Sequence, residues 1–295
     1  MADTLGLDRD ALARLLRAAA NLSLVEAMPA GRFALTPDGQ YLRSDHEHSL
    51  AAECADNDLF QVWTGFMHSL RTGQPAFPEI FGESFFERLS GDRQRSSLFH
   101  EHMRRRAVGL YAPLLDIEPF RRAAVCVDVG GGTGALLAQL LRRHPRLTGV
   151  LYDLPDVVAD SPLCTEPGLS SRCRAVGGNA RRWVPEDGDL YVLASVLHDF
   201  DDPEALLLLR SCRRSMAPSD TLLLLERVLP PGPQPHPGQL SDLWMLLVVG
   251  GRERTLEHWN RLARKAGFRL AHTHSVEDHE VAALEFRPGG EPGRE

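Results

Sequence analysis

The chain has 295 residues, of which 43% are hydrophobic and 25% charged, and its formal net charge is −7. This composition is typical of a soluble globular protein with one large domain or two ordinary ones. The net negative charge disfavours a nucleic-acid surface over the whole protein. No apolar run approaches the roughly 18 residues of a membrane span, and no secretory signal opens the sequence, so neither membrane insertion nor secretion is expected.

Cysteine usage points to a reducing compartment. The five cysteines are widely spaced and form no Cys-x-x-Cys pair; they are Cys54, Cys126, Cys164, Cys173 and Cys212. Spacing of this kind favours incidental or buried thiols over a disulfide framework. A cytoplasmic location is therefore predicted.

The first forty residues contain a helix followed by a strand pair and a turn. Apolar residues recur on one helical face between Leu7 and Leu24, and a short alternating stretch, 31–36, precedes the turn at Thr36 to Gly39. This order resembles a winged helix. Nearby acids offset Arg14 and Arg17, so a small packing unit is favoured over a DNA-reading one.

Residues 50–120 read as helical segments broken at Gly73 to Pro75 and at Ser90 to Asp92. Aromatic side chains are dense here and, at helical spacing, are more often core than ligand contacts. They could still line one wall of a pocket between domains. A hinge is predicted at Pro113 to Pro119, which separates a mainly helical domain, 1–112, from a second domain, 113–295.

From residue 124 onward, strand and helix patterns alternate. Strands are predicted at 124–129, 148–153, 172–176, 189–195, 221–227, 268–275 and 279–286. Helices are predicted at 134–143, 203–215 and 255–266, and a proline-rich loop at 230–238. This alternation predicts an α/β domain of Rossmann-like type, with a doubly wound, mostly parallel sheet. The short connection between the last two strands makes them antiparallel.

A glycine cluster follows the first of these strands directly. The β-branched run ends at Asp128, and Gly130, Gly132 and Gly134 allow a tight turn and close approach of a ligand to the backbone. The spacing formally matches a dinucleotide fingerprint, which by itself is a weak signal. Asp153, at the end of the next strand, is the expected acceptor for a ribose diol. These residues fit NAD and equally well any other adenosine cofactor.

Five short motifs follow one another along the chain: Asp128 to Gly134, Tyr152 to Pro155, Val196 to Asp199, Leu225 to Pro230 and Gly250 to Thr255. With these stretches the chain resembles class I S-adenosylmethionine-dependent O-methyltransferases of the plant-caffeate and hydroxyindole type, a group with many bacterial natural-product members. The resemblance covers nearly the whole chain. It implies transfer of a methyl group to a hydroxyl of a phenolic or polyketide-like small molecule, with domain 113–295 binding the cofactor.

The resemblance also implies roles for individual residues. His198 would be the general base, flanked by Glu226 and Glu253. S-Adenosyl-L-methionine would be held by Asp128, Gly130, Gly132, Asp153, Leu154, Asn179 and Ala180. The substrate would contact His100, Met103, Asp199, Trp244 and Met245. Domain 1–112 would be of the dimerisation type, but the family's opening helices, which entwine two subunits, are largely absent, so the resemblance leaves the homodimer open.

The chemistry supports the base assignment independently. Methyl transfer from a sulfonium is an in-line displacement, so the enzyme must align the reactants and remove a hydroxyl proton. Histidine suits the second task because its pKa lies near neutrality, and a carboxylate on the other ring nitrogen would fix the tautomer. For His198 the competing interpretation is a helix-capping or solvated loop residue, and for Glu226 an ordinary strand-end carboxylate. For Glu253 it is simple pairing with Arg252 or Arg254.

The sequence departs from the family at the adenine site. Gly178-Asn179-Ala180 stands where the family carries Gly-Asp-Phe. Asn179 keeps an acceptor oxygen but loses the charge, and Ala180 removes the stacking surface. Weaker cofactor binding is therefore predicted. Phe200, where the family usually has tryptophan, is a mild change.

The remaining histidines do not form a zinc-binding pattern, and three other functions compete with methyl transfer. The histidine pairs 46/48, 100/102 and 272/274 lack a cysteine or acidic partner at zinc spacing, so no metal is predicted. The alternatives are a same-fold enzyme that performs decarboxylation, hydroxylation or cyclisation, a winged-helix DNA-binding regulator and an NAD dehydrogenase. Retention of His198 with both glutamates favours methyl transfer to a small molecule, with neither nucleic acid nor membrane as partner.

Overall fold

The structure is a computed structural model that describes residues 1–46, 49–51, 57–159, 161–277 and 279–289. It divides into two compact units, Met1–Phe60 and Gln61–Glu295. The functional division predicted at residues 112 and 113 stays a prediction. Within the described residues, no helix combines the length and the apolar character needed to cross a lipid bilayer.

The first unit is small and has little interior. Its elements are α1 (Ala2–Leu5), α2 (Arg9–Asn21), β1 (Val25–Met28) and β2 (Arg32–Leu35), and the two strands form an antiparallel hairpin. Asp8 caps α2 by accepting a hydrogen bond from the Ala11 amide at 2.9 Å. The predicted helix and strand pair are confirmed, whereas the winged-helix assignment stays a prediction. Among the described residues of this unit, no apolar side chain is buried.

A helical segment opens the second unit. Its helices are α4 (Asn57–Gln61, at the boundary between the units), α5 (Phe66–Thr72), α6 (Ala76–Phe81), α7 (Phe85–Gly91), α8 (Arg93–Tyr111) and α9 (Glu118–Arg122). The breaks predicted near Gly73 and Asp92 are confirmed. Phe77 is buried at the centre of a small core with Phe66, Phe81 and Phe85 packed on it, so these four side chains are core, as expected. Phe60, Trp63 and Phe86 are exposed.

The second unit is built on one mixed sheet. Its strands are β3 (Val125–Val129), β4 (Thr148–Asp153), β5 (Cys173–Gly177), β6 (Leu190–Ala194), β7 (Thr221–Leu229), β8 (Arg254–Thr255), β9 (Phe268–His274) and β10 (Val281–Pro288). Their order is β5-β4-β3-β6-β7-β10-β9, and β8 pairs with β7. Strands β3 to β7 are parallel, and β10 runs antiparallel to both of its neighbours. The predicted Rossmann-like class is confirmed.

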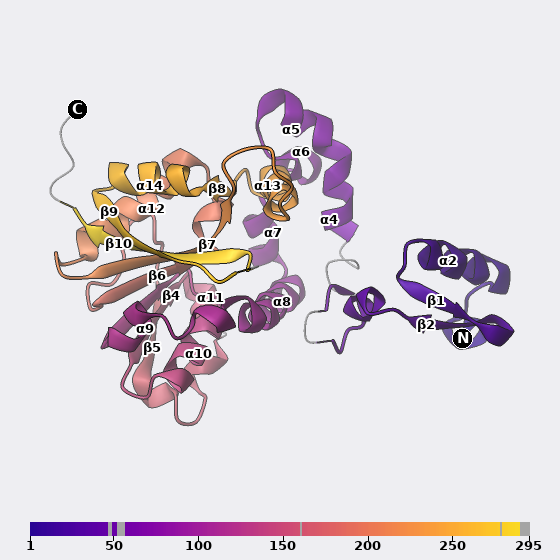
Figure 1. Ribbon diagram of the computed structural model, residues 1–295, viewed down its shortest axis with the longest axis horizontal. Helices are drawn as coiled ribbons and strands as arrows, with labels where there is room; N and C mark the ends of the chain where they lie inside the picture. The colour runs from indigo at the N-terminus through magenta and orange to yellow at the C-terminus, as the bar shows by residue number, and fades with distance from the viewer. Residues whose placement is uncertain (47–48, 52–56, 160, 278, 290–295) are drawn as a thin grey trace. The chain divides into compact units, whose positions relative to one another are not determined.

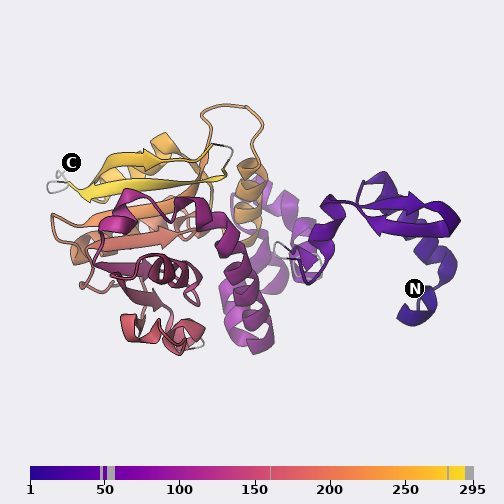
Figure 2. The same cartoon turned by 60° about the horizontal axis from the view of Figure 1, so that its bottom comes forward.

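Helices cover both faces of the sheet. The remaining ones are α10 (Ala135–Arg143), α11 (Pro155–Ala159), α12 (Asp202–Ser215), α13 (Gly238–Val248) and α14 (Leu256–Lys265). Helices α12 and α14 lie on one face, and α9, α10 and α11 lie on the other (Figure 1). Alternate strand residues, such as Val127 and Cys126, enter the two opposite cores. Helices of the opening segment lie beside α13 (Figure 2), and their side chains form a third, smaller core.

Candidate active site

His198 lies in a tight turn directly after strand β6. The turn is one 3₁₀ segment, Leu197–Asp199. Ser195, which precedes it, has a φ of 52°, a left-handed conformation that is uncommon outside glycine. The hydroxyl of Tyr111, at the end of α8, donates a hydrogen bond to Ser195 Oγ at 2.8 Å and so ties this unusual conformation to the helical segment. The turn presents His198 at the carboxyl edge of the sheet, where open α/β folds carry their chemistry.

A second loop packs against this turn backbone to backbone. The amide of Arg252 donates to the carbonyl oxygen of His198 at 2.8 Å. A Cβ added at Gly251 would lie 2.0 Å from that same carbonyl oxygen, well inside any real contact. Only glycine therefore permits the approach that brings Glu253, two residues later, to the histidine ring.

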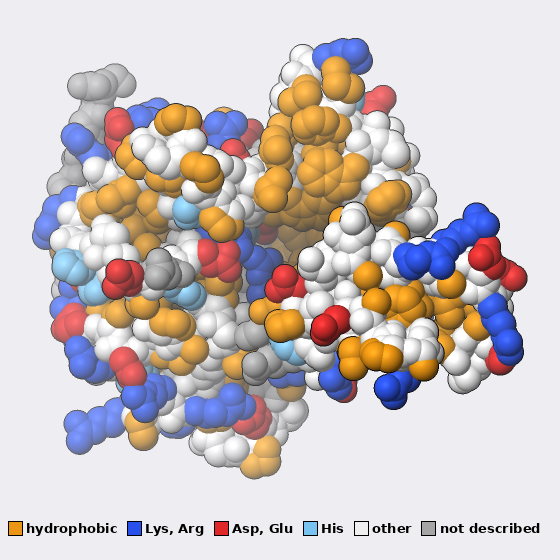
Figure 3. Space-filling view, turned by 45° about the vertical axis from the view of Figure 1, so that its right-hand side comes forward, with side chains coloured by type: hydrophobic (Ala, Val, Ile, Leu, Met, Phe, Trp, Pro, Cys, Tyr) orange, Lys and Arg blue, Asp and Glu red, His pale blue; other side chains and the backbone are white. Residues whose placement is uncertain are grey.

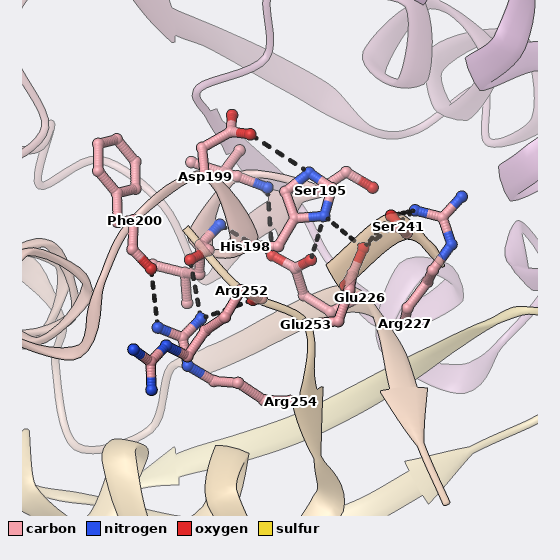
Figure 4. Close-up of polar contacts among 12 residues, drawn as sticks. Ser195, His198, Asp199, Phe200, Glu226, Arg227, Ser241, Arg252, Glu253 and Arg254 are labelled. Carbon is pink, nitrogen blue, oxygen red and sulfur yellow. Dashed lines mark hydrogen bonds and ion pairs between the residues drawn. The ribbon is translucent and has the colours of Figure 1, made fainter. Parts of the chain in front are cut away.

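Two buried carboxylates face the same ring nitrogen of His198 (Figure 4). Glu253 Oε1 lies 3.2 Å from Nδ1, and Glu226 Oε2 lies 3.8 Å from it. The other oxygen of Glu226 accepts hydrogen bonds from the amides of Val196 and Leu197 at 3.1 and 2.8 Å, so β7 fixes the base of the turn. The predicted grouping of His198 with both glutamates is thus present, and its catalytic role remains a proposal. The neighbouring-arginine alternative for Glu253 does not hold, because its partners are His198, Arg227 and Ser241.

The charges around the ring favour its protonated form. Burial by itself lowers the pKa of His198, but the negative charges of Glu226 and Asp199 and the hydrogen bond with Glu253 outweigh burial and raise this pKa to about 9. Burial also acts to raise the pKa of Glu253, but His198, Ser241 and Arg227 together hold it at about 2. Burial raises the pKa of Glu226 to about 7 against the attraction of His198. Glu253 is therefore the permanently ionised partner of the ring.

Several supporting residues were not anticipated from the sequence. Ser241, on α13, donates to Glu253 Oε1 at 2.6 Å, and Arg227 donates to the same oxygen at 3.2 Å. Asp242 accepts from the Glu253 amide at 2.9 Å. A helix pattern ahead of Trp244 could have suggested that residues one turn earlier would reach the site, but no local signal marks Arg227 as a partner of a glutamate so distant in sequence.

The ring nitrogen of His198 and one oxygen from each glutamate lie within 4.8 Å of one another, a grouping that could hold a metal ion. Glu253 Oε1 is already neutralised by the Arg227 guanidinium and the Ser241 hydroxyl. Since its pKa is raised to about 9, protonated His198 would supply positive charge opposite the glutamates without a metal ion. The prediction that no metal is needed stays a prediction. Among the other histidines, His272 and His274 share a strand face as expected, with ring centroids 4.4 Å apart, whereas His48 lies outside the described residues.

The glycine turn, residues 130–134, lies beside the turn that carries His198. Gly130 has a φ of 71°, and a Cβ there would lie 2.8 Å from a methyl carbon of Val196. Asp128 is buried at the end of β3, and neither carboxylate oxygen has a hydrogen-bond partner among the described residues. Asp153, at the end of β4, accepts from the amides of Gly132 and Leu154, each at 2.7 Å. Burial, followed by the charge of Asp153, raises the pKa of Asp128 to about 7.

The predicted substrate residues come from three elements. His100 and Met103 are half-buried on α8, which packs against α10, the helix that follows the glycine turn. Trp244 and Met245 are half-buried on α13. Asp199 Oδ1 lies 3.6 Å from Nε2 of His198, on the side of the ring away from the glutamates.

Residues 63–269 match the family model of the O-methyltransferase domain. The chain belongs to this family. Relatives of this O-methyltransferase include O-demethylpuromycin-O-methyltransferase of Streptomyces alboniger, 40% identical, with 91% of this chain and 74% of the relative covered. The 3-amino-4-hydroxybenzoate 4-O-methyltransferase of Streptomyces cremeus is 36% identical, with coverage of 96% and 79%.

Solved structures of O-methyltransferases are also similar to this chain. That of NcsB1, an O-methyltransferase from neocarzinostatin biosynthesis in complex with S-adenosylmethionine and 2-hydroxy-5-methyl naphthoic acid, is 32% identical. It superimposes with a TM-score of 0.84 over 97% of this chain and 87% of that one. With the family match, the enzyme is an S-adenosylmethionine-dependent O-methyltransferase.

The glycine turn of this O-methyltransferase fits its cofactor. S-Adenosylmethionine carries two positive charges, an ammonium and a sulfonium. The two unpartnered oxygens of Asp128 and the nearby Asp153 carboxylate form an acidic site that suits these positive charges. Gly132 has positive φ, and a Cβ there would meet nothing within 4 Å, so the turn faces open space. The half-exposed Leu154 offers an apolar neighbour for an adenosine.

If Asp128 holds the cofactor, the affinity of this O-methyltransferase for it should depend on pH. A cationic ligand favours the ionised carboxylate, whose pKa burial and Asp153 raise to about 7 in the free protein. We expect the affinity for S-adenosylmethionine to rise with pH through about 7, by about tenfold between pH 6 and pH 8. Calorimetry at both pH values measures it. Asp128→Asn should bind more weakly with a flatter pH dependence; an unchanged dependence in this variant would assign the titration to another group.

Asn179 and Ala180 are the residues predicted to contact the adenine of the cofactor. Asn179 Oδ1 accepts a hydrogen bond from the Arg181 amide at 3.0 Å, so its side chain closes a local turn. Ala180 packs on the core with its single methyl group and offers no ring for stacking. Both observations agree with the predicted weak adenine contact, which remains a proposal.

Ala180→Phe tests that proposal. Stacking of a base on an aromatic side chain is worth about 1–3 kcal/mol, so we expect about tenfold tighter binding of S-adenosylhomocysteine. Calorimetry compares the variant with Ala180→Leu, which adds apolar area without a flat ring. Equal gains in both variants would attribute the effect to general hydrophobic contact.

Proposed function

We propose that this enzyme methylates a hydroxyl group of a small aromatic molecule of phenolic or polyketide-like type. The observation that carries the proposal is the polarisation of His198: its Nδ1 faces two buried carboxylates, Glu253 at 3.2 Å and Glu226 at 3.8 Å. This arrangement leaves Nε2 as the nitrogen available to a substrate. The names of relatives that act on a hydroxybenzoate and of one crystallised with a naphthoic acid support an aromatic acceptor.

The chain's own residues account for proton removal. S-Adenosylmethionine, when bound, supplies the electrophilic methyl group. His198 takes the hydroxyl proton at Nε2 while Glu253 accepts a hydrogen bond from Nδ1–H, which fixes the tautomer. The imidazolium so formed is stabilised by Glu226 and Glu253. Gly130, Gly132, Asp128, Asp153, Leu154, Asn179 and Ala180 would hold the cofactor.

Helix α13 connects the proposed substrate surface, which contains Trp244 and Met245, to Glu253, the partner of the base His198. Ser241 bonds to Glu253, and Trp244 and Met245 follow it by three and four residues, so they lie one turn further along the same helix face. The ring of Trp63 lies 6.0 Å from that of Trp244. Two indoles and a thioether form a surface suited to a flat aromatic substrate. His100 and Met103 on α8 and Asp199 beside Nε2 would complete the substrate site.

We also propose that the enzyme is a cytoplasmic homodimer. The first unit buries no apolar side chain among its described residues, so a segment of its size lacks a core of its own. Hydrophobic side chains also gather over the upper helices of the second unit (Figure 3), where Trp63, Met67 and Leu70 are between 42% and 53% exposed. A second copy of the chain would bury such surfaces. Light scattering tests this, with a monomeric mass as the contradicting result.

The proposed activity is tested with a methyl donor labelled in its methyl group and a panel of phenols, hydroxynaphthoates and hydroxylated polyketides. Mass spectrometry should find the label on one hydroxyl of at least one member. Consumption of substrate without label transfer would favour the same-fold non-methylating alternative. Salt-dependent binding to a DNA fragment, without turnover, would favour the regulator.

A further inference from the structure

Arg254 is a buried arginine whose donors are all engaged. Its side chain is 0% exposed, which is rare for a guanidinium. Nε and Nη2 donate to Asp202 Oδ1 at 3.0 and 2.9 Å, and the plane of the group lies over the ring of Trp259 at 4.8 Å. Asp202 in turn contacts Nε2 of His258 at 2.7 Å. The guanidinium is thus held on one edge by a carboxylate and on one face by an indole.

One remaining N–H donates to the carbonyl oxygen of Arg252 at 3.3 Å, and the others bind both ends of the turn that carries His198 (Figure 4). Nη1 donates to the carbonyl oxygen of Leu197 at 3.0 Å, and Nη2 donates to that of Phe200 at 2.8 Å. These carbonyls flank His198 and Asp199 on either side. A planar fork with fixed spacing is needed to reach both, and a lysine ammonium offers no such geometry.

The backbone of Arg254 is fixed by the strand that carries the other glutamate. In β8, Arg254 pairs in parallel with Val228 of β7, two residues after Glu226. Glu253, the hydrogen-bonded partner of Nδ1, is the residue immediately before it. Arg254 therefore joins three things in one residue: the strand of Glu226, the position of Glu253 and the turn of His198.

We propose that Arg254 is a positioning residue for proton removal, and that its guanidinium sets the distance between His198 Nδ1 and Glu253. The proposal rests on the base role proposed for His198. Without the guanidinium, the carbonyl oxygens of Leu197 and Phe200 would lose these hydrogen bonds, and the His198 ring would move away from Glu253. A displacement of about 1 Å in such a constellation can lower the rate by about 100-fold.

Arg254→Lys tests the proposal, since it keeps the charge and removes the fork. We expect kcat to fall by about 10- to 100-fold, with the KM for S-adenosylmethionine within about twofold of the parent. NMR of the ligand-free protein measures the titration of His198 without turnover. The His198 signal is the one that disappears in His198→Asn. Glu226, Asp199 and Glu253 face the His198 ring. A looser contact with Glu253 should lower the pKa of His198 by about one unit.

The control is Arg261→Lys, an exposed arginine on α14 that forms a surface ion pair with Glu257. It should leave kcat and the His198 titration unchanged. If Arg254→Lys does not fold, Asp202→Asn, which weakens the anchor of the guanidinium, should lower kcat and the His198 pKa in the same direction. An unchanged His198 titration in a folded Arg254 or Asp202 variant would overturn the positioning role. Absence of methyl transfer by the parent enzyme would instead overturn the proposed function, because the titration is independent of turnover.

Discussion

His198→Asn is expected to lower kcat by about 100- to 10,000-fold, the usual contribution of a positioned general base. Asparagine keeps a donor for Glu253 but has no basic nitrogen at the position of Nε2. Binding of S-adenosylhomocysteine should stay within about twofold of the parent, because no residue of the glycine turn hydrogen-bonds to His198 in the described part of the chain. Rates come from labelled methyl transfer and affinities from calorimetry. Full activity in this variant would rule out the base assignment.

The pH profile gives a second measurement on the same residue. The base must be neutral to accept a proton, and its surrounding carboxylates raise its pKa to about 9. We therefore expect kcat/KM to rise with pH up to about 9, with the protonated form inactive at lower pH. Glu226→Gln removes the charge that raises this pKa most, so the rising limb should move to lower pH. A limb that stays in place would mean that another group titrates.

Gly251→Ala is expected to abolish most activity and to destabilise the fold. The new Cβ would lie 2.0 Å from the carbonyl oxygen of His198 and 2.6 Å from the carbonyl carbon of Asp199, both of them backbone atoms that no side-chain rotation can move aside. Overpacking of this kind costs about 1–3 kcal/mol or more, and relief requires the His198 turn and Glu253 to separate. Thermal unfolding and labelled methyl transfer measure the two effects.

The matched control is Gly91→Ala, at the end of α7, where a Cβ would meet nothing within 4 Å. That substitution should leave activity unchanged and stability the same or slightly higher. Equal behaviour of the two variants would mean that the loop of residue 251 adapts to a side chain, and that its close approach to His198 is not required.

The fold followed from local patterns. The run of residues 125–129 is apolar except for Asp128, as expected of a buried parallel strand, and the glycines after it mark the turn that the structure contains. The strand at 148–153 matches its prediction residue for residue. These features are encoded within a few neighbouring positions, so periodicity and turn chemistry suffice to find them.

The site could be predicted only in part. The grouping of His198, Glu226 and Glu253 came from the resemblance to a family and from their places at strand ends. The contacts that support it join residues far apart in sequence, such as Arg254 with Leu197 and Tyr111 with Ser195. No periodicity encodes such pairs, since they depend on how helices and loops pack at the sheet edge. The role of Asn179 at the cofactor stays a prediction, and the hydrogen bond that its Oδ1 accepts from the Arg181 amide is a local contact that the sequence analysis did not foresee.

The pairing of β8 with β7 has a consequence for how this enzyme can change. The chain leaves β7 at Leu229 and returns to the same strand at Arg254 and Thr255, so the segment between them is a closed excursion that carries Trp244 and Met245. Both ends are fixed on the strand that holds Glu226. Substitutions within residues 230–249 that spare Ser241 and Asp242 could therefore change the proposed substrate surface, while His198, Glu226 and Glu253 keep their places. Evolution, or a library of variants restricted to this segment, could use that freedom.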